Sequence, residues 1–146
     1  MVATRSAGET GLSATKAAWW LVAPYTFERS EVPARSPESL GDGQVLLRFL
    51  AAGICGSDLP GFRGTQGRVP GDTGRCAAEK EGFPIHEVVG EVLASRHPEH
   101  HAGDRVVGWA SGFDGLMEQV VADGDGLASY DQALRPEHAV ALQPLA

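Results

Sequence analysis

Cysteine is scarce in this chain of 146 residues, which contains only Cys55 and Cys76. The two could pair in principle, but sequence cannot establish their distance, and a reducing compartment keeps such residues as thiols. No apolar run approaches the roughly 20 residues that cross a bilayer, and Met1 to Thr15 lacks the apolar core of a secretory signal. We therefore expect a cytoplasmic protein with no membrane partner and two free thiols.

Basic residues are also few: 12 Lys and Arg stand against 19 Asp and Glu, and the formal net charge is −7. The sequence contains no basic stripe that could neutralise a run of phosphates. Nucleic acid is therefore excluded as an expected partner.

The length is that of one domain, because two domains of ordinary size would not fit. The 19 glycines and 9 prolines, with 42% hydrophobic and 21% charged residues, are typical of a folded domain with many turns and short strands. Residues 1–15 lack periodicity and predict a flexible N-terminal arm. Residues 16–146 predict the domain itself, and the Gly-rich segment 61–83 predicts a long insertion loop within it.

Short apolar and β-branched segments, separated by turn residues, run through the domain. We expect strands at 16–22, 25–32, 44–52, 85–94, 105–109 and 116–121, and one short helix at 136–142 that begins with a proline. Many short strands with little helix predict a mainly β domain, either a small barrel or a sandwich.

The residues that carry chemistry are the stretch Gly-Ile-Cys-Gly-Ser-Asp at 53–58 and, later in the chain, His86 and Glu87 at the start of a predicted strand. Thiolate and imidazole are the usual zinc ligands, and a catalytic zinc site uses three protein ligands with a fourth position open. Each residue alone also has a structural explanation: packing for the cysteine, a satisfied polar group for the histidine, caps for the serine and aspartate, and a surface charge for the glutamate.

The order of these motifs resembles that of the zinc-dependent medium-chain alcohol dehydrogenases, whose first ligand lies in a Gly-x-Cys-Gly-[Ser/Thr]-Asp turn and whose second lies in a Gly-His-Glu strand start. Further agreement comes from Gly90-Glu91-Val92, Gly103-Asp104-Arg105-Val106 and the terminal Gln143-Pro144-Leu145-Ala146, which resembles Glu-Pro-Leu-Ala. Several motifs in the correct order are more specific than any one of them. The resemblance implies a GroES-like, partly open β-barrel with short helices, lacking the Rossmann domain of that family.

By this resemblance Cys55 and His86 bind zinc, and Glu87 is an outer or exchanging metal ligand that also takes part in catalysis. Ser57 relays the hydroxyl proton of the substrate, and Asp58 accepts a hydrogen bond from the non-ligating nitrogen of His86, which fixes the tautomer. Bound zinc lowers the pKa of a coordinated alcohol or water and polarises a carbonyl oxygen. The implied substrate is a small molecule that bears a hydroxyl or carbonyl group.

The sequence departs from the family pattern at several points. Gln143 replaces the glutamate that is often the third zinc ligand, and Ile85 replaces the glycine before the histidine. No cluster of four cysteines follows Trp109, so a structural-zinc lobe is not expected. No Gly-x-Gly-x-x-Gly segment occurs, so NAD(P) is expected only if a partner domain supplies its site.

Three functional hypotheses follow. The first is an enzyme or enzyme domain with an open zinc site, which by itself performs non-redox chemistry of the isomerase, lyase or cyclase type. The second is the catalytic half of an NAD(P)-dependent alcohol dehydrogenase completed by another chain, and the third is a scaffold or dimerisation module whose Gln143 marks a decayed metal site. Because a Rossmann domain normally covers one face, we also expect an exposed apolar patch, covered in a homodimer or by a partner chain.

Two further groups have more than one interpretation. The run from His97 to His101 lies between predicted strands and is expected to be an exposed polar loop rather than a metal site. Trp109 and Phe113 either line a substrate cleft near the metal or belong to the barrel core.

Overall fold

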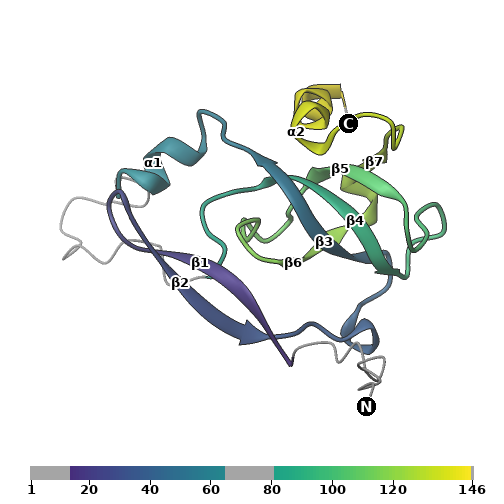
Figure 1. The fold of residues 1–146 in the computed structure, drawn as a ribbon, viewed down its shortest axis with the longest axis horizontal. Coiled ribbons are helices and arrows are strands. Elements are labelled where there is room, and N and C mark those ends of the chain that lie inside the picture. The colour runs from purple at the N-terminus through teal and green to yellow at the C-terminus, as the bar shows by residue number, and fades with distance from the viewer. Residues whose placement is uncertain (1–13, 65–80, 146) are drawn as a thin grey trace, which may run out of the picture.

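Two antiparallel sheets organise the computed structural model, which describes residues 14–64 and 81–145 (Figure 1). The smaller sheet is a hairpin of β1 (Thr15–Ala23) and β2 (Thr26–Pro33). The larger sheet has the order β6-β3-β4-β5-β7 and neither sheet closes. Its strands are β3 (Gln44–Gly53), β4 (Glu87–Ser95), β5 (Arg105–Trp109), β6 (Gln119–Asp123) and β7 (Leu127–Ser129). The expectation of a mainly β, partly open architecture is confirmed.

The hairpin is fastened to the larger sheet through β1. Ala18 forms an isolated bridge with Met117, and both side chains are buried in the same core cluster. On either side of this bridge the Trp19 amide donates to the carbonyl of Leu116, and the Glu118 amide donates to the carbonyl of Ala17, each at 2.9 Å. The predicted hairpin is therefore present and packs against the larger sheet at residues 116–118.

Both faces of the larger sheet are covered, because successive side chains of a strand point to opposite faces. In β4, Val88 belongs to the main core cluster, whereas Val89 belongs to a second cluster with Ala139. Val106 and Val107 divide between the two clusters in the same way. Burying each such side chain stabilises the fold by about 1.5–3 kcal/mol, which explains why the central strands are almost wholly apolar.

Helices are short. They are α1 (Asp58–Phe62), α2 (Pro136–Ala139) and the 3₁₀ helices η1 (Pro37–Ser39), η2 (Gly124–Gly126) and η3 (Val140–Leu145). Among them, α2 with the following 3₁₀ turn packs on one face of the larger sheet. The predicted helix at 136–142 corresponds to α2 and the start of η3, with a proline in the first turn as expected. None of the helices in the described residues has the length and apolarity needed to cross a bilayer.

The predicted arm and insertion fall largely outside the described residues. Of the arm, Ala14 and Thr15 are described, and Thr15 already belongs to β1. Of the 61–83 segment, residues 61 and 62 belong to α1, and Phe83 packs with Leu21 in a small core cluster. Cys76 and the rest of residues 65–80 are not described, so the loop assignment there stays a prediction.

Candidate metal centre

Cys55 lies in the turn between β3 and α1, and two hydrogen bonds between Cys55 and Asp58 close this turn. The Asp58 amide donates to the Cys55 carbonyl at 3.2 Å, while the Cys55 amide donates to Oδ2 of Asp58 at 2.8 Å. Ser57 precedes α1 but makes no side-chain cap; its Oγ lies 2.7 Å from Cys55 Sγ, and its amide donates to the same sulfur at 3.3 Å. The turn therefore fixes the thiol and places a hydroxyl beside it.

His86 comes from the residue before β4 and faces this turn. Its Nδ1 lies 2.8 Å from Oδ1 of Asp58, and the two residues are 8% and 2% exposed. A carboxylate can only accept a hydrogen bond, so Nδ1 carries the proton and the lone pair of Nε2 is free to bind a metal. That Nε2 lies 3.7 Å from Cys55 Sγ.

The sulfur–nitrogen distance can be compared with what zinc requires. Bonds of about 2.3 Å to sulfur and about 2.05 Å to nitrogen place the two ligand atoms about 3.6 Å apart at a tetrahedral angle. The observed 3.7 Å corresponds to an angle of about 116° at such an ion. Cys55 and His86 thus fit two positions of a zinc site, with the imidazole already in the required tautomer.

Asp58 is the third member of this group of potential ligands: one donor atom from each of Cys55, Asp58 and His86 lies within 4.8 Å of the other two. Both of its oxygens are already used, one by the Cys55 amide and one by the His86 ring. Asp58 thus orients the Cys55 turn and the His86 ring, while the role in metal binding that the resemblance implied stays a prediction.

Glu87 is not part of this group. It pairs with Gly53 in the β3–β4 ladder, and its carboxylate occupies the space that a Cβ on Gly53 would need. Because adjacent residues of an extended chain point to opposite faces, the Glu87 side chain is expected to diverge from that of His86. Because His86 and Glu87 are adjacent in the sequence, this alternation could have indicated that they do not both face the same site.

Gln143 lies in η3 and is 2% exposed, yet neither amide atom has a hydrogen-bond partner. Residues three apart eclipse in a 3₁₀ helix, so Gln143 lies on the same side as Val140, whose Cγ1 approaches Gly53. Gly53 is two residues before Cys55. The amide that replaces the family's glutamate is therefore buried without a partner on the side of η3 that faces the end of β3.

Trp109 and Phe113, which the sequence left between cleft and core, both lie against the His86 ring, with centroid distances of 5.0 and 4.9 Å. Both remain partly exposed, by 38% and 45%. They therefore lie beside the candidate metal centre rather than fill the core.

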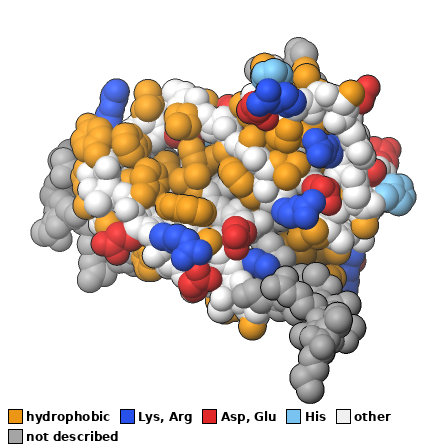
Figure 2. Space-filling model, viewed as in Figure 1, with side chains coloured by type: hydrophobic (Ala, Val, Ile, Leu, Met, Phe, Trp, Pro, Cys, Tyr) orange, Lys and Arg blue, Asp and Glu red, His pale blue; other side chains and the backbone are white. Residues whose placement is uncertain are grey.

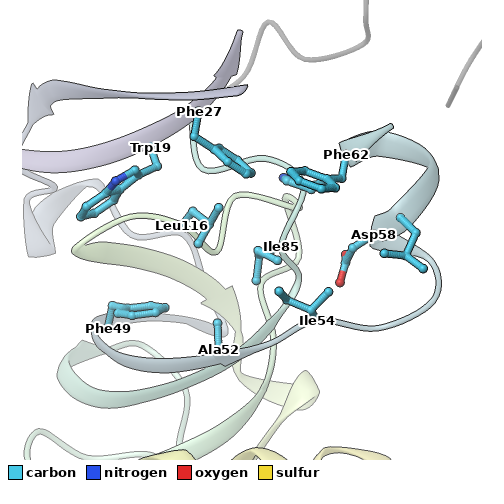
Figure 3. A pocket seen from close by; sticks show the side chains of 11 residues that line it. Trp19, Phe27, Phe49, Ala52, Ile54, Asp58, Phe62, Ile85 and Leu116 are labelled. Carbon is cyan, nitrogen blue, oxygen red and sulfur yellow. The ribbon is translucent and has the colours of Figure 1, made fainter. Parts of the chain in front are cut away.

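An apolar pocket of about 610 Å³ opens on the Asp58 side of the centre (Figure 3). Apart from Asp58 its described lining is apolar: Trp19, Phe27, Phe49, Ala52, Ile54, Leu59, Phe62, Pro84, Ile85 and Leu116. Hydrophobic side chains gather over this part of the surface, near β1, β2 and α1 (Figure 2). An exposed apolar patch is thus present as expected, while its coverage by a second copy or a partner chain stays a prediction.

The run from His97 to His101 differs from the exposed loop that was expected. His100 is 5% exposed, its Nε2 donates to the Gly124 carbonyl at 3.0 Å, and its ring stacks on that of His97. His97 in turn bonds Asp125 at 3.0 Å. The expectation was wrong for these two rings, because they fasten the loop to η2; in the described part of the chain they form no group of three metal donors.

Comparison with known proteins places these observations in a family. Residues 41–134 match the alcohol dehydrogenase GroES-like domain family. An erythritol/L-threitol dehydrogenase from Mycolicibacterium smegmatis is 39% identical over 89 residues, which cover 57% of this chain and 23% of the relative.

Solved structures share the fold. An oxidoreductase/dehydrogenase of unknown specificity from Escherichia coli superposes with a TM-score of 0.66 at 18% identity, over 90% of this chain and 44% of that protein. A quinone oxidoreductase from Pseudomonas syringae superposes with a TM-score of 0.62 at 20% identity, over 88% of this chain and 37% of that protein. The chain thus spans less than half of these relatives, and it belongs to the alcohol dehydrogenase GroES-like domain family.

Proposed function

We propose that this chain is the catalytic domain of a zinc-dependent dehydrogenase that acts on a small metabolite with a hydroxyl or carbonyl group. The observation that carries the proposal is the distance of 3.7 Å between Cys55 Sγ and His86 Nε2, with the tautomer of His86 set by Asp58. The hydride carrier, NAD(P), would be held by a nucleotide-binding domain outside these residues or on a partner chain. The family and the erythritol/L-threitol dehydrogenase relative support this over other chemistry.

Each residue of the centre has a proposed task. Cys55 and His86 hold zinc, which supplies polarisation of the substrate oxygen when bound. Gln143 is the proposed third ligand through its amide oxygen, a weaker donor than a carboxylate, because it is buried without a partner. Ser57, whose hydroxyl is at the thiol, carries the substrate's hydroxyl proton away. Glu87 serves as an outer acid or base only if its side chain rotates away from its position beside Gly53.

Metal content tests the proposal most directly. The purified chain should contain or take up one zinc per chain by elemental analysis, and Cys55→Ser and His86→Gln should each abolish this binding. His101→Gln is the matched control, because His101 is exposed and its nearest charged partner is Asp104 at 3.8 Å. A wild-type chain that takes up no zinc would contradict the proposal.

Activity separates the hypotheses that remain. With a nucleotide-binding partner domain and either nicotinamide, the zinc-loaded protein should oxidise erythritol, L-threitol or a related small alcohol. Turnover of such a substrate without any nicotinamide would favour isomerase, lyase or cyclase chemistry instead. A biological role that survives both ligand substitutions would favour the scaffold hypothesis.

A further inference from the structure

The His86 imidazole is enclosed by two aromatic side chains. Trp109 stacks on it almost in parallel, with centroids 5.0 Å apart and an interplanar angle of 10°. The Phe113 ring lies 4.9 Å away and is tilted by 38°. Since both aromatic residues are partly exposed, core burial does not account for their position. The contact that they share is the ring of the candidate metal ligand.

Phe113 reaches this position at a conformational cost. Its φ is +54°, a left-handed conformation that is unfavourable for a bulky side chain and that clusters at functional sites. The backbone explains how the residue is held: the Phe113 amide donates to the Ala110 carbonyl at 2.9 Å, and the Ala110 amide donates to the His86 carbonyl at 2.7 Å. The turn that carries the phenyl ring is thus hydrogen-bonded to the residue that the ring covers.

Trp109 is placed by the neighbouring strand. It pairs with Glu87 in the β4–β5 ladder, one residue from His86. A Cβ built on Gly126 would lie 3.8 Å from Trp109 Cδ1, so the indole lies beside the last residue of η2. The end of β5 and the turn that follows it thus place both aromatic rings against the imidazole.

We propose that Trp109 and Phe113 are positioning residues that hold the plane of the His86 ring, and so the direction of its Nε2, for metal binding. Asp58 sets the tautomer and holds the Nδ1 edge of the ring by a hydrogen bond, while the two aromatic side chains restrict rotation of the ring out of its plane. The free Nε2 edge is then directed toward Cys55. The inference rests on the proposed zinc site. It explains the aromatic contacts of His86 by the need to orient a metal ligand rather than by core packing.

The test measures zinc affinity by competition with a chromophoric chelator, together with the visible absorption spectrum of the Co²⁺-substituted chain. Trp109→Leu and Phe113→Asn should each weaken zinc binding about tenfold and alter the Co²⁺ spectrum. Asparagine is chosen at position 113 because it tolerates the left-handed backbone conformation found there. Trp109→Phe and Phe113→Tyr keep an aromatic ring and should retain wild-type affinity. Leu93→Ala is the control, because Leu93 is similarly exposed, at 37%, and lies near the end of β4 that is distant from His86.

Long-range ¹⁵N–¹H spectra of the metal-free chain give a second readout. The wild type should show a single Nδ1-protonated form of His86, and Trp109→Leu and Phe113→Asn should show a mixture or broadening. If the wild type binds no zinc yet the variants lose this order, the positioning inference stands and the zinc proposal fails. If both variants keep wild-type zinc affinity, Co²⁺ spectrum and His86 signals, the positioning inference is overturned.

Discussion

Asp58→Asn is the most informative single change in the metal centre, because Asp58 uses both carboxylate oxygens as acceptors for Cys55 and His86. Asparagine is nearly isosteric but offers one acceptor oxygen and one amino group. If its oxygen faces His86, the amino group faces the Cys55 amide, and two donors oppose each other. If the oxygen faces Cys55, Nδ1 of His86 must accept a hydrogen bond, and the proton moves to Nε2.

Each orientation has a distinct cost. The first leaves the Cys55 amide unsatisfied in a site where Asp58 is 2% exposed, which lowers the free energy of unfolding by about 1–3 kcal/mol. The second protonates the ligand nitrogen, and loss of such an orienting partner lowers metal affinity by about 10–100-fold. At about 1.4 kcal/mol for each factor of ten, the binding loss is about 1.4–2.8 kcal/mol. The variant cannot avoid both costs.

Two assays separate these outcomes: chemical denaturation of the metal-free chain for the first, and zinc competition with a chelator for the second. The chain provides a matched control, since Asp125 also bonds a histidine, His97, at 3.0 Å but has a side chain that is 90% exposed. Asp125→Asn should leave zinc affinity unchanged and alter stability by less than about 1 kcal/mol. Wild-type stability together with wild-type zinc affinity in Asp58→Asn would refute the reasoning.

Further predictions concern the fold. Gly108→Ala should destabilise by about 1–3 kcal/mol or more in urea, because its Cβ would overlap the Gly126 carbonyl, whereas Gly56→Ala meets nothing within 4 Å and should be nearly neutral. Leu47→Ala, at a fully buried position, should cost about 2–5 kcal/mol. Burial raises the pKa of Tyr130 above 10.0. The contribution of its neutral form to the free energy of unfolding is therefore complete below pH 10.0 and is lost as pH rises through the raised pKa. Tyr130→Phe should remove this decline in stability at high pH.

Most of the fold could be predicted because its strands are local patterns. The run at 44–52 and the valines of 85–94 predicted buried strands, and both are central in the larger sheet. The helix α1 was not predicted: it has five residues and contains Pro60, so it has too few positions for a periodic pattern. It forms because the turn at Cys55 and the contacts of Phe62 with Tyr25 and Phe27 hold it.

The site was only partly predictable for a related reason. The sequence shows a cysteine at 55 and a histidine at 86, which are candidate metal ligands. The contacts of His86 with Trp109 and Phe113 depend on strand pairing and on a positive φ at Phe113, and no local sequence pattern indicates either feature. His97 and His100 were expected to be exposed because the run around them is polar, yet the space above Gly124 accommodates the His97 ring. Packing against glycine is a tertiary property, and sequence alone does not reveal it.

The register of one strand pair explains why two residues 31 positions apart meet. β3 and β4 are antiparallel, and Gly53 at the end of β3 is opposite Glu87 at the start of β4. Cys55 lies just beyond one strand and His86 just before the other, so the ladder brings them together whatever the length of chain between them. A slip of one residue would turn His86 toward the opposite face. The candidate metal centre is therefore specified by the same apolar strands that form the core, and the proximity of Cys55 and His86 should be lost together with the β3–β4 pairing.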